Sequence, residues 1–454
     1  MIKEMRIRNF KSFTDVRVPL SRVTFLIGAN ASGKSNALEV LRFASWMGHG
    51  DRLDDVERKF GKQGSIRGGV RDMFSWGQES VVASTGTASI VKVESDRKEF
   101  TIGFDVESKG SVYRIDQTIR NLEYQHLSLS DEQLRSLDRQ SPLYYVKPQQ
   151  GSESVDTIQV AWNNFKRGGR RPVVSCSNRR AVFQQMQDDD RFGMKSGESP
   201  VANASRVISK VRDAIVFLAP ETAKMRGYVQ IQSGCRIEED GSNLSSVLFN
   251  ICQNEYVKKD LIAFVSSLPE QSIRGVNFSR TATGDVMVVL KEGFGVFEQM
   301  PASLLSDGTL RALAIGAALF GAQPGSTVVI EEIDKGIHPS RAKRLVEQLY
   351  AIANARDVQI IMTTHNPALM DAVPREEFAN VLSCYRDPSM YDSRICRLGD
   401  MPQYMDLAMR GSLGASAVDG ELSRAAIDNR SEGDVRRQRM AWLEDFMTGN
   451  GGGL

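Results

Sequence analysis

The chain has 454 residues, about three times a common domain length of about 150, so more than one core is expected. Hydrophobic residues make up 41% and charged residues 25%, which is typical of a globular protein. The longest apolar stretch, residues 310–320, is shorter than the about 20 residues of a membrane-spanning helix. The net charge of +2 provides no global field for nucleic acid, so any such binding would need a local basic patch.

The cysteines argue against an oxidised or zinc-stabilised protein. Five of them are scattered without a C-x-x-C spacing, which disfavours a disulfide framework and a zinc site: Cys176, Cys235, Cys252, Cys384 and Cys396. Three of the first six residues are charged, and these six residues contain no apolar export segment. We therefore expect a cytoplasmic protein without a membrane partner.

The N-terminal residues predict a strand, a loop and a helix. Residues 5–18 alternate between apolar and polar side chains, and residues 23–27 form an apolar, β-prone run. Residues 36–47 carry apolar side chains at helical spacing, and Gly48-His49-Gly50 ends that pattern.

The rest of the chain divides by pattern. Residues 89–119 predict an antiparallel sheet with a hairpin turn at Lys109-Gly110. Residues 128–205 are polar and motif-poor, which suggests an inserted or mobile region. Further patterns predict helices near 204–218, 245–268 and 435–447, and buried parallel strands at 327–330 and 359–362.

A phosphate-binding loop follows the apolar run. Gly28-Ala29-Asn30-Ala31-Ser32-Gly33-Lys34-Ser35 fits G-x-x-x-x-G-K-[ST] between a predicted strand and a predicted helix. Its backbone N–H groups would face phosphates, Lys34 would reach the β- and γ-phosphates, and Ser35 would bind Mg²⁺. A chance glycine-rich turn is the alternative, but both flanks agree with the loop. The nucleotide-binding residues expected here are Asn30, Ala31, Ser32, Gly33, Lys34, Ser35 and Asn36.

Two later strands end in groups that suit ATP hydrolysis. The run 327–330 is followed by Glu331, which would hold Mg²⁺, and by Glu332, which would orient or deprotonate the attacking water. A solvated Glu-Glu turn is the alternative. The run 359–364 ends at His365, which would contact the γ-phosphate and the water, although a structural histidine would fit the same place.

The stretch Leu305-Ser306-Asp307-Gly308-Thr309 opens an apolar helix and resembles the signature of the ABC, SMC and RecF class of ATPases. Without that resemblance it is a helix start capped by Ser306 or Asp307. The loop, the signature, the paired glutamates and the histidine stand in the order of that class. The resemblance implies that Ser306 and Gly308 contact nucleotide.

Two more segments resemble heads of this class. Residues 7–13 resemble an "NF-[KR]-S-[FH]" strand, which implies nucleotide contacts for Asn9, Lys11 and Ser12, and residues 331–339 resemble "DEPExGLHP". Glu331 stands where that class usually has Asp. The resemblance covers about 1–120 and 240–375 and is nearest to compact "predicted ATPases" related to OLD-family heads, as in the Septu and PARIS anti-phage systems. Gly241-Ser242-Asn243-Leu244 also resembles that group.

The expected fold is α/β, an ABC-type P-loop ATPase head. It would have a mixed central sheet with flanking helices, an antiparallel β subdomain and an inserted middle region. The expected divisions are 1–125 and 241–375 for the two parts of the head, 126–240 for the insertion, and 376–454 for a tail in oligomer or partner contact. The glutamine of a Q-loop is not assigned; Gln78, Gln149 and Gln150 remain candidates.

A basic segment offers a nucleic-acid hypothesis. Residues 157–187 lack acidic side chains and interleave basic residues with Trp162 and Phe165. This mixture suits contact with DNA or RNA by phosphate pairing and base stacking, whereas a solvated hairpin or a protein-docking surface explains it equally well. The basic residues are Lys166, Arg167, Arg170, Arg171, Arg179 and Arg180.

The resemblance implies an ATP-operated switch in which two heads close around two nucleotides and act on a separate effector, such as a nuclease, in anti-phage defence. The alternative is a RecF-like repair ATPase that binds DNA itself. A transporter subunit is disfavoured by residues 7–13, and the stretch after His365 is too short for a fused nuclease domain.

Overall fold

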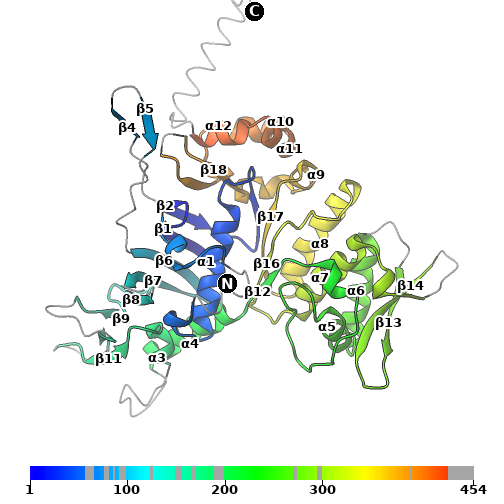
Figure 1. Cartoon of the computed structure of the whole chain (residues 1–454), viewed down its shortest axis with the longest axis horizontal. Helices are drawn as coiled ribbons and strands as arrows, with labels where there is room; N and C mark the ends of the chain where they lie inside the picture. Colours follow the sequence, from blue (N-terminus) through cyan, green and yellow to red (C-terminus); the bar gives the residue numbers. More distant parts are fainter. Residues whose placement is uncertain are drawn as a thin grey trace, which may run out of the picture.

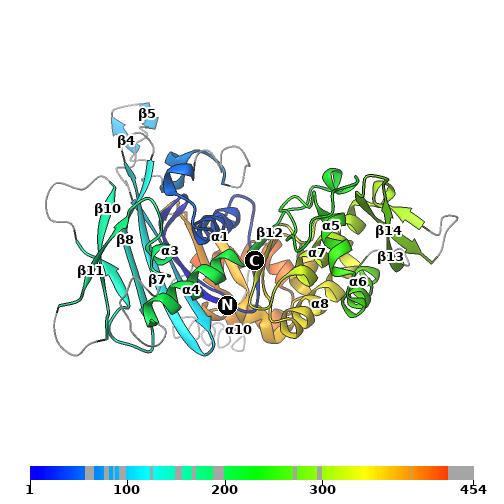
Figure 2. The ribbon, with the colours of Figure 1, turned by 90° about the horizontal axis from the view of Figure 1, so that it is seen from below.

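The structure, a computed structural model, describes residues 1–56, 66–75, 81–84, 87–90, 99–122, 126–148, 156–165, 170–187, 199–268, 273–293, 299–388 and 390–427. A six-stranded sheet lies in the middle of the molecule (Figure 1). Figure 2 shows an eight-stranded sheet on one side of it, and helices with a three-stranded sheet on the other. The arrangement is the mixed α/β architecture that the sequence predicts.

The central sheet has the order β12-β16-β17-β3-β18-β19. The first five strands of that order are parallel, and β19 pairs antiparallel with β18. The predicted parallel strands at 327–330 and 359–362 are therefore confirmed as neighbours. The bounds are β3 (Val23–Ile27), β12 (Ile215–Leu218), β16 (Thr327–Ile330), β17 (Gln359–Thr364), β18 (Leu382–Arg386) and β19 (Ser393–Arg397).

The central strands separate two hydrophobic cores, which explains why they are apolar on both faces. In β16, Val329 packs into the core shared with the eight-stranded sheet, whereas Val328 and Ile330 pack into the core on the helical side. In β17, Ile361 and Ile360 divide in the same way. Buried, doubly covered strands of this kind hold the residues at their ends in fixed positions.

The eight-stranded sheet is antiparallel and has the order β11-β10-β9-β8-β7-β6-β1-β2. The predicted turn at Lys109-Gly110 is confirmed, with φ of 49° and 81°. The bounds are β1 (Ile2–Phe10), β2 (Phe13–Pro19), β6 (Glu99–Ser108), β7 (Ser111–Leu122), β8 (His126–Ser136), β9 (Tyr144–Val146), β10 (Thr157–Trp162) and β11 (Val173–Ser177).

The eight-stranded sheet continues past residue 126 into residues 126–240, which the sequence predicts to be an insertion. β8 pairs with β7 along its length, and β9, β10 and β11 add to it in turn. Glu132 on β8 is fully buried and accepts hydrogen bonds from Tyr144 Oη (2.6 Å) and from the backbone N–H groups of Val182 and Phe183 (3.0 and 2.7 Å). The four strands β8 to β11 of this region are thus an integral part of the eight-stranded sheet, whereas β12 belongs to the central sheet. The buried polar contacts of Glu132 help to hold these strands, and the sequence does not reveal them.

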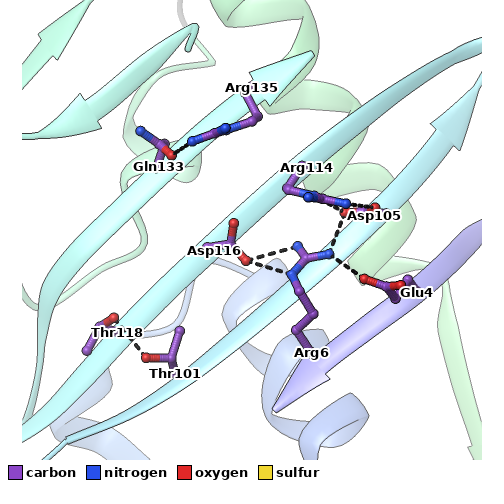
Figure 3. A network of polar contacts seen from close by, with 9 residues as sticks. All are labelled: Glu4, Arg6, Thr101, Asp105, Arg114, Asp116, Thr118, Gln133 and Arg135. Carbon is purple, nitrogen blue, oxygen red and sulfur yellow. Dashed lines mark hydrogen bonds and ion pairs between the residues drawn. The ribbon is translucent and has the colours of Figure 1, made fainter. Parts of the chain in front are cut away.

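The outer face of this sheet carries a network of charged side chains (Figure 3). Arg6 donates to Asp105 (2.7 Å) and to Asp116 (3.0 Å), and Arg114 donates to Asp105 (2.8 Å). Gly103 leaves the space for these groups, since a Cβ there would lie 2.1 Å from Asp116 Oδ1. The alternation of apolar and polar residues in β1 therefore places one set in the core and the other in this network.

Helices cover the central sheet. The helix predicted at 36–47 is α1, and the one predicted at 204–218 ends earlier, because the β-branched residues after it form β12. The predicted helix at 435–447 lies outside the described residues. The bounds are α1 (Lys34–Gly48), α3 (Val182–Gln185), α4 (Pro200–Asp213), α5 (Leu244–Ile251), α6 (Glu255–Ser267), α7 (Asp307–Gly321), α8 (Ala342–Ala355), α9 (Pro367–Asp371), α10 (Tyr404–Arg410), α11 (Leu413–Val418) and α12 (Glu421–Ile427).

The remaining elements lie at the periphery. A three-stranded sheet consists of β13 (Ile273–Arg280), β14 (Val286–Glu292) and β15 (Gln299–Pro301), and a hairpin consists of β4 (Val81–Ser84) and β5 (Thr87–Ile90). The tail expected from residue 376 contributes β18 and β19 to the central sheet, so the sheet extends past that boundary. Among the described residues, no helix has the length and apolar character needed to cross a membrane.

Candidate nucleotide site

The phosphate-binding loop lies between β3 and α1 and has little space around it. Gly28 and Gly33 have φ of 146° and 113°, and Ala31 has φ of 61°. A Cβ on Gly28 would lie 2.1 Å from the carbonyl oxygen of Cys384, and one on Gly33 would lie 2.6 Å from Ser393 Oγ. The strands β18 and β19 therefore form the wall against which the loop bends. Asn30 and Ala31 are exposed, whereas Ser32 is buried.

Lys34 lies over its own loop. Its Nζ donates hydrogen bonds to the carbonyl oxygens of Gly28 (2.7 Å) and Ala29 (2.8 Å). Burial lowers the pKa of this ammonium group, while nearby acidic groups, among them Glu332, act in the opposite direction. These hydrogen bonds hold the ammonium group of Lys34 against the loop, whose backbone N–H groups would face a bound phosphate.

Ser35 and Glu331 meet although 296 residues separate them in sequence: Ser35 Oγ donates to Glu331 Oε1 at 2.8 Å. A hydroxyl and a carboxylate are oxygen ligands of the kind that Mg²⁺ takes, together with phosphate oxygens. Within the described ranges, no group of three or more His, Cys, Asp or Glu side chains could hold a metal ion. The oxygen atoms of Ser35 and Glu331 fit Mg²⁺ in their chemistry.

Glu332 follows directly and its side chain is exposed. Its φ is 50°, and its backbone N–H donates to Thr363 Oγ1 on β17 at 2.9 Å. His365 follows β17 and is also exposed. Because β17 lies between β16 and β3, Glu332, His365 and the loop come from adjacent strands at the carboxyl edge of one parallel sheet.

The turn between β1 and β2 contacts the beginning of α1. Ser12 Oγ accepts a hydrogen bond from Asn36 Nδ2 at 2.7 Å, and Asn9 has φ of 54°. Lys11 is buried, forms an ion pair with Glu39 on α1 and donates to the carbonyl oxygen of residue 67 at 2.7 Å. Lys11 is therefore placed to anchor the turn on α1.

The signature turn is a preformed helix start. Ser306 is the N-cap of α7, and its Oγ accepts from the N–H of Thr309 at 3.2 Å. Gly308 lies against the loop that follows Glu332, since a Cβ there would lie 2.4 Å from the carbonyl oxygen of Gly336. Arg226 holds the turn from the other side, donating to the carbonyl oxygen of Leu305 (2.7 Å) and to Asp307 Oδ1 (2.7 Å).

Arg42 and Glu239 lie beside Glu331, although no motif in the sequence marks either residue. Arg42 is buried on α1, forms an ion pair with Glu239, and places its NH2 nitrogen 3.5 Å from Glu331 Oε2. Burial raises the pKa of Glu239, and Glu331 acts in the same direction while Arg42 opposes it. Arg42 could have been found from helical spacing, because it follows Ser35 by two turns and therefore lies on the same face of α1. No such spacing identifies Glu239.

Of the two aromatic side chains predicted to stack on bases in the basic segment, one is buried, and the other, Phe165, is partly exposed with Arg139 over its ring. Trp162 is buried, with 8% of its surface exposed, so stacking on bases is not open to it. Arg179 forms ion pairs with Asp54 and Asp156, and Arg171 donates to the carbonyl oxygen of Pro142 at 3.1 Å. Lys166 and Arg167, together with the three Q-loop candidates, lie outside the described residues.

Two family models match the chain. One is described as "AAA ATPase domain" and matches residues 1–148; the other is described as "AAA domain, putative AbiEii toxin, Type IV TA system" and matches residues 246–371. A curated "ATP/GTP phosphatase" from Helicobacter pylori (strain ATCC 700392 / 26695) is 21% identical over 407 residues, covering 86% of this chain and 94% of the relative. The matched ranges include the loop, the signature, the paired glutamates and His365.

Solved structures with a general likeness are SMC head domains. One, bound to the C-winged helix domain of ScpA, has a TM-score of 0.47 and 13% identity, and covers 87% of this chain and 96% of that chain. The head from Thermotoga maritima has a TM-score of 0.42 and 14% identity, and covers 87% and 98%. Because both scores are low, the identification of the chain as an ATPase rests on the family models, the curated relative and the geometry of the site.

Proposed function

We propose that this ATPase, which has an ABC/SMC-like head, works as a switch in which two copies close around two molecules of ATP. In each site Lys34 would bind the β- and γ-phosphates, and Ser35 and Glu331 would hold Mg²⁺. Glu332 would orient or deprotonate the attacking water, and His365 would contact the γ-phosphate. The bound metal would supply charge neutralisation at the phosphates.

The observation that supports the paired arrangement is the form of the signature turn. Its backbone is fixed by Arg226 and by the contact of Gly308 with Gly336, yet Ser306 and Asp307 remain exposed to solvent. A rigid, exposed turn at a helix N-terminus suits the γ-phosphate of a nucleotide held by another copy. Leu304, directly before it, is 66% exposed and would be covered by the same contact.

Glu332→Gln tests this function. The amide cannot act as a base, so we expect the variant to bind ATP, to hydrolyse it at least about 100-fold more slowly and to double its mass when ATP is added. Light scattering after size exclusion and a phosphate-release assay measure both effects. Lys34→Ala is the control, and it should neither bind ATP tightly nor change mass. Hydrolysis by Glu332→Gln at the parent rate would refute the base assignment, and an ATP-bound monomer would refute the switch.

We extend the proposal to anti-phage defence with a separate effector such as a nuclease. Support comes from the resemblance to OLD-like heads and from the family description that names a toxin of a type IV system. Cells that carry the chain with its neighbouring genes should resist phage infection, and Lys34→Ala should abolish that resistance in a plaque assay. The buried Trp162 and the paired Arg179 give no support to the RecF-like alternative.

A further inference from the structure

Arg42 lies between two carboxylates with different surroundings. Glu331 directs Oε1 to the hydroxyl of Ser35 and Oε2 to Arg42 NH2, 3.5 Å away. The same guanidinium nitrogen forms a closer ion pair with Glu239. The guanidinium carbon lies 5.0 Å from the centroid of the Phe217 ring, so a third side chain restricts where the charge can move.

Backbone hydrogen bonds join both Glu239 and Glu331 to the end of β12. The N–H of Ala219, just after β12, donates to the carbonyl oxygen of Glu239 at 2.8 Å. The N–H of Glu331 donates to the carbonyl oxygen of Leu218 at 3.1 Å. Both residues are therefore bonded through their backbones to the end of the same strand, β12, and the carboxylates of both contact one arginine on α1.

Electrostatics makes this arrangement relevant to metal binding. A positive charge beside Glu331 weakens the attraction of its carboxylate for a second cation, and a bound Mg²⁺ would repel Arg42. An arginine that is buried needs a carboxylate partner at all times, because a lone buried charge is costly. Glu239 provides such a partner when Glu331 is engaged by the metal.

We propose that Arg42 and Glu239 set the affinity of this site for its divalent metal. Arg42 competes with Mg²⁺ for Glu331, and Glu239 retains the arginine so that the competition stays weak. Arg42 and Glu239 are thus positioning residues that act through Glu331. The inference rests on the proposed metal-binding role of Ser35 and Glu331, and it does not depend on the pairing of two heads.

The experiment measures how Mg²⁺ promotes binding of a fluorescent, non-hydrolysable ATP analogue to the full chain at low protein concentration. Glu239→Gln releases Arg42 to Glu331, so the Mg²⁺ concentration for half-maximal binding should rise by roughly 3- to 10-fold. Arg42→Gln removes the competitor, so that concentration should fall by a similar factor. Arg42→Lys keeps the charge and should stay close to the parent.

Asp357→Asn is the matched control, since Asp357 also pairs with an arginine, Arg22 at 2.9 Å, but lies outside the site. It should leave the Mg²⁺ dependence unchanged. Shifts of Glu239→Gln and Arg42→Gln in opposite directions support the inference, and they distinguish it from general damage, which would move both the same way. Equal shifts, or no shift in either variant, would overturn it. If binding of the analogue to the parent protein did not depend on Mg²⁺, the metal site itself would be overturned, whereas the paired-head switch would still stand.

Discussion

The backbone at Gly28 leaves no space for a side chain. Its φ of 146° is unfavourable for other residues, and the carbonyl oxygen of Cys384 lies where a Cβ would be placed. Because Gly28 has no side chain, the curled loop packs directly against the backbone of β18. The glycine of the motif thus serves packing against the C-terminal part of the chain as well as the approach of phosphate.

Gly28→Ala should therefore destabilise the protein by more than about 2 kcal/mol and weaken ATP binding, because the backbone of β18 cannot yield easily. Thermal or denaturant unfolding and nucleotide titration measure the two effects. Gly284→Ala is the control, since Gly284 also has a positive φ of 90° but has no atom within 4 Å of the added Cβ. The control should cost about 1 kcal/mol and leave ATP binding intact. Similar losses in both variants would mean that strain, and not the collision, explains the effect.

Single residues differ in how far the sequence reveals them. Lys34, Ser35 and Glu331 stand in motifs with a fixed chemical meaning, and the contact of Ser35 with Glu331 agrees with their expected shared role. Glu239 stands in no recognisable pattern, because its importance arises from the meeting of β12 with α1. Lys11 shows the opposite case, since its motif suggests nucleotide while its ammonium group contacts Glu39.

At the scale of elements, Arg226 links the segment after β12 to the signature turn. It donates to the carbonyl oxygens of Ser303 (3.1 Å) and Leu305 (2.7 Å) and to Asp307. Hydrogen bonds from Thr222 and, to a smaller extent, from Arg226 keep the pKa of Asp307 below its usual value. The turn is therefore shaped before any partner arrives.

Arg226→Met should loosen this turn and lower ATP hydrolysis by at least about 10-fold, because removed charge-assisted hydrogen bonds are worth about 1.5 to 3 kcal/mol each. ATP binding to the loop of the same chain should remain near the parent value. Lys224→Met is the control, since Lys224 forms exposed ion pairs with Glu221 and Asp240 nearby. If hydrolysis by Arg226→Met matched that of Lys224→Met, the turn would not depend on Arg226.

Helices, strands and turns that follow from a local sequence pattern could be predicted, whereas those stabilised by residues distant in sequence could not. Ser306 as the cap of α7, the turn at Lys109-Gly110 and the strands 327–330 and 359–362 all follow from local sequence. The strands after residue 126 are short or polar, and their burial depends on contacts such as those of Glu132. Likewise, β18 gains its place by pairing with β3, and β19 gains its place by pairing with β18.

At the scale of the whole molecule, the proposed switch shares each site between two copies. Ser306→Arg should block hydrolysis while sparing ATP binding, because in the proposed switch this exposed turn would face the partner's nucleotide and not its own. Mixing Ser306→Arg with Lys34→Ala subunits should restore some activity, since one composite site in a mixed pair has both intact halves. A phosphate-release assay over a range of mixing ratios measures this recovery. Continued inactivity of mixtures whose subunits demonstrably exchange would argue against shared sites.

The order of the central sheet also has a consequence for how the chain matures. The loop strand β3 is made early in synthesis, but its neighbours β17 and β18 come more than 300 residues later. Pairings over such separations form slowly, because a long loop must close before they stabilise anything. The nucleotide site can therefore form only after residues beyond 380 have left the ribosome, and a growing chain cannot become a working ATPase before its last sheet strands are in place.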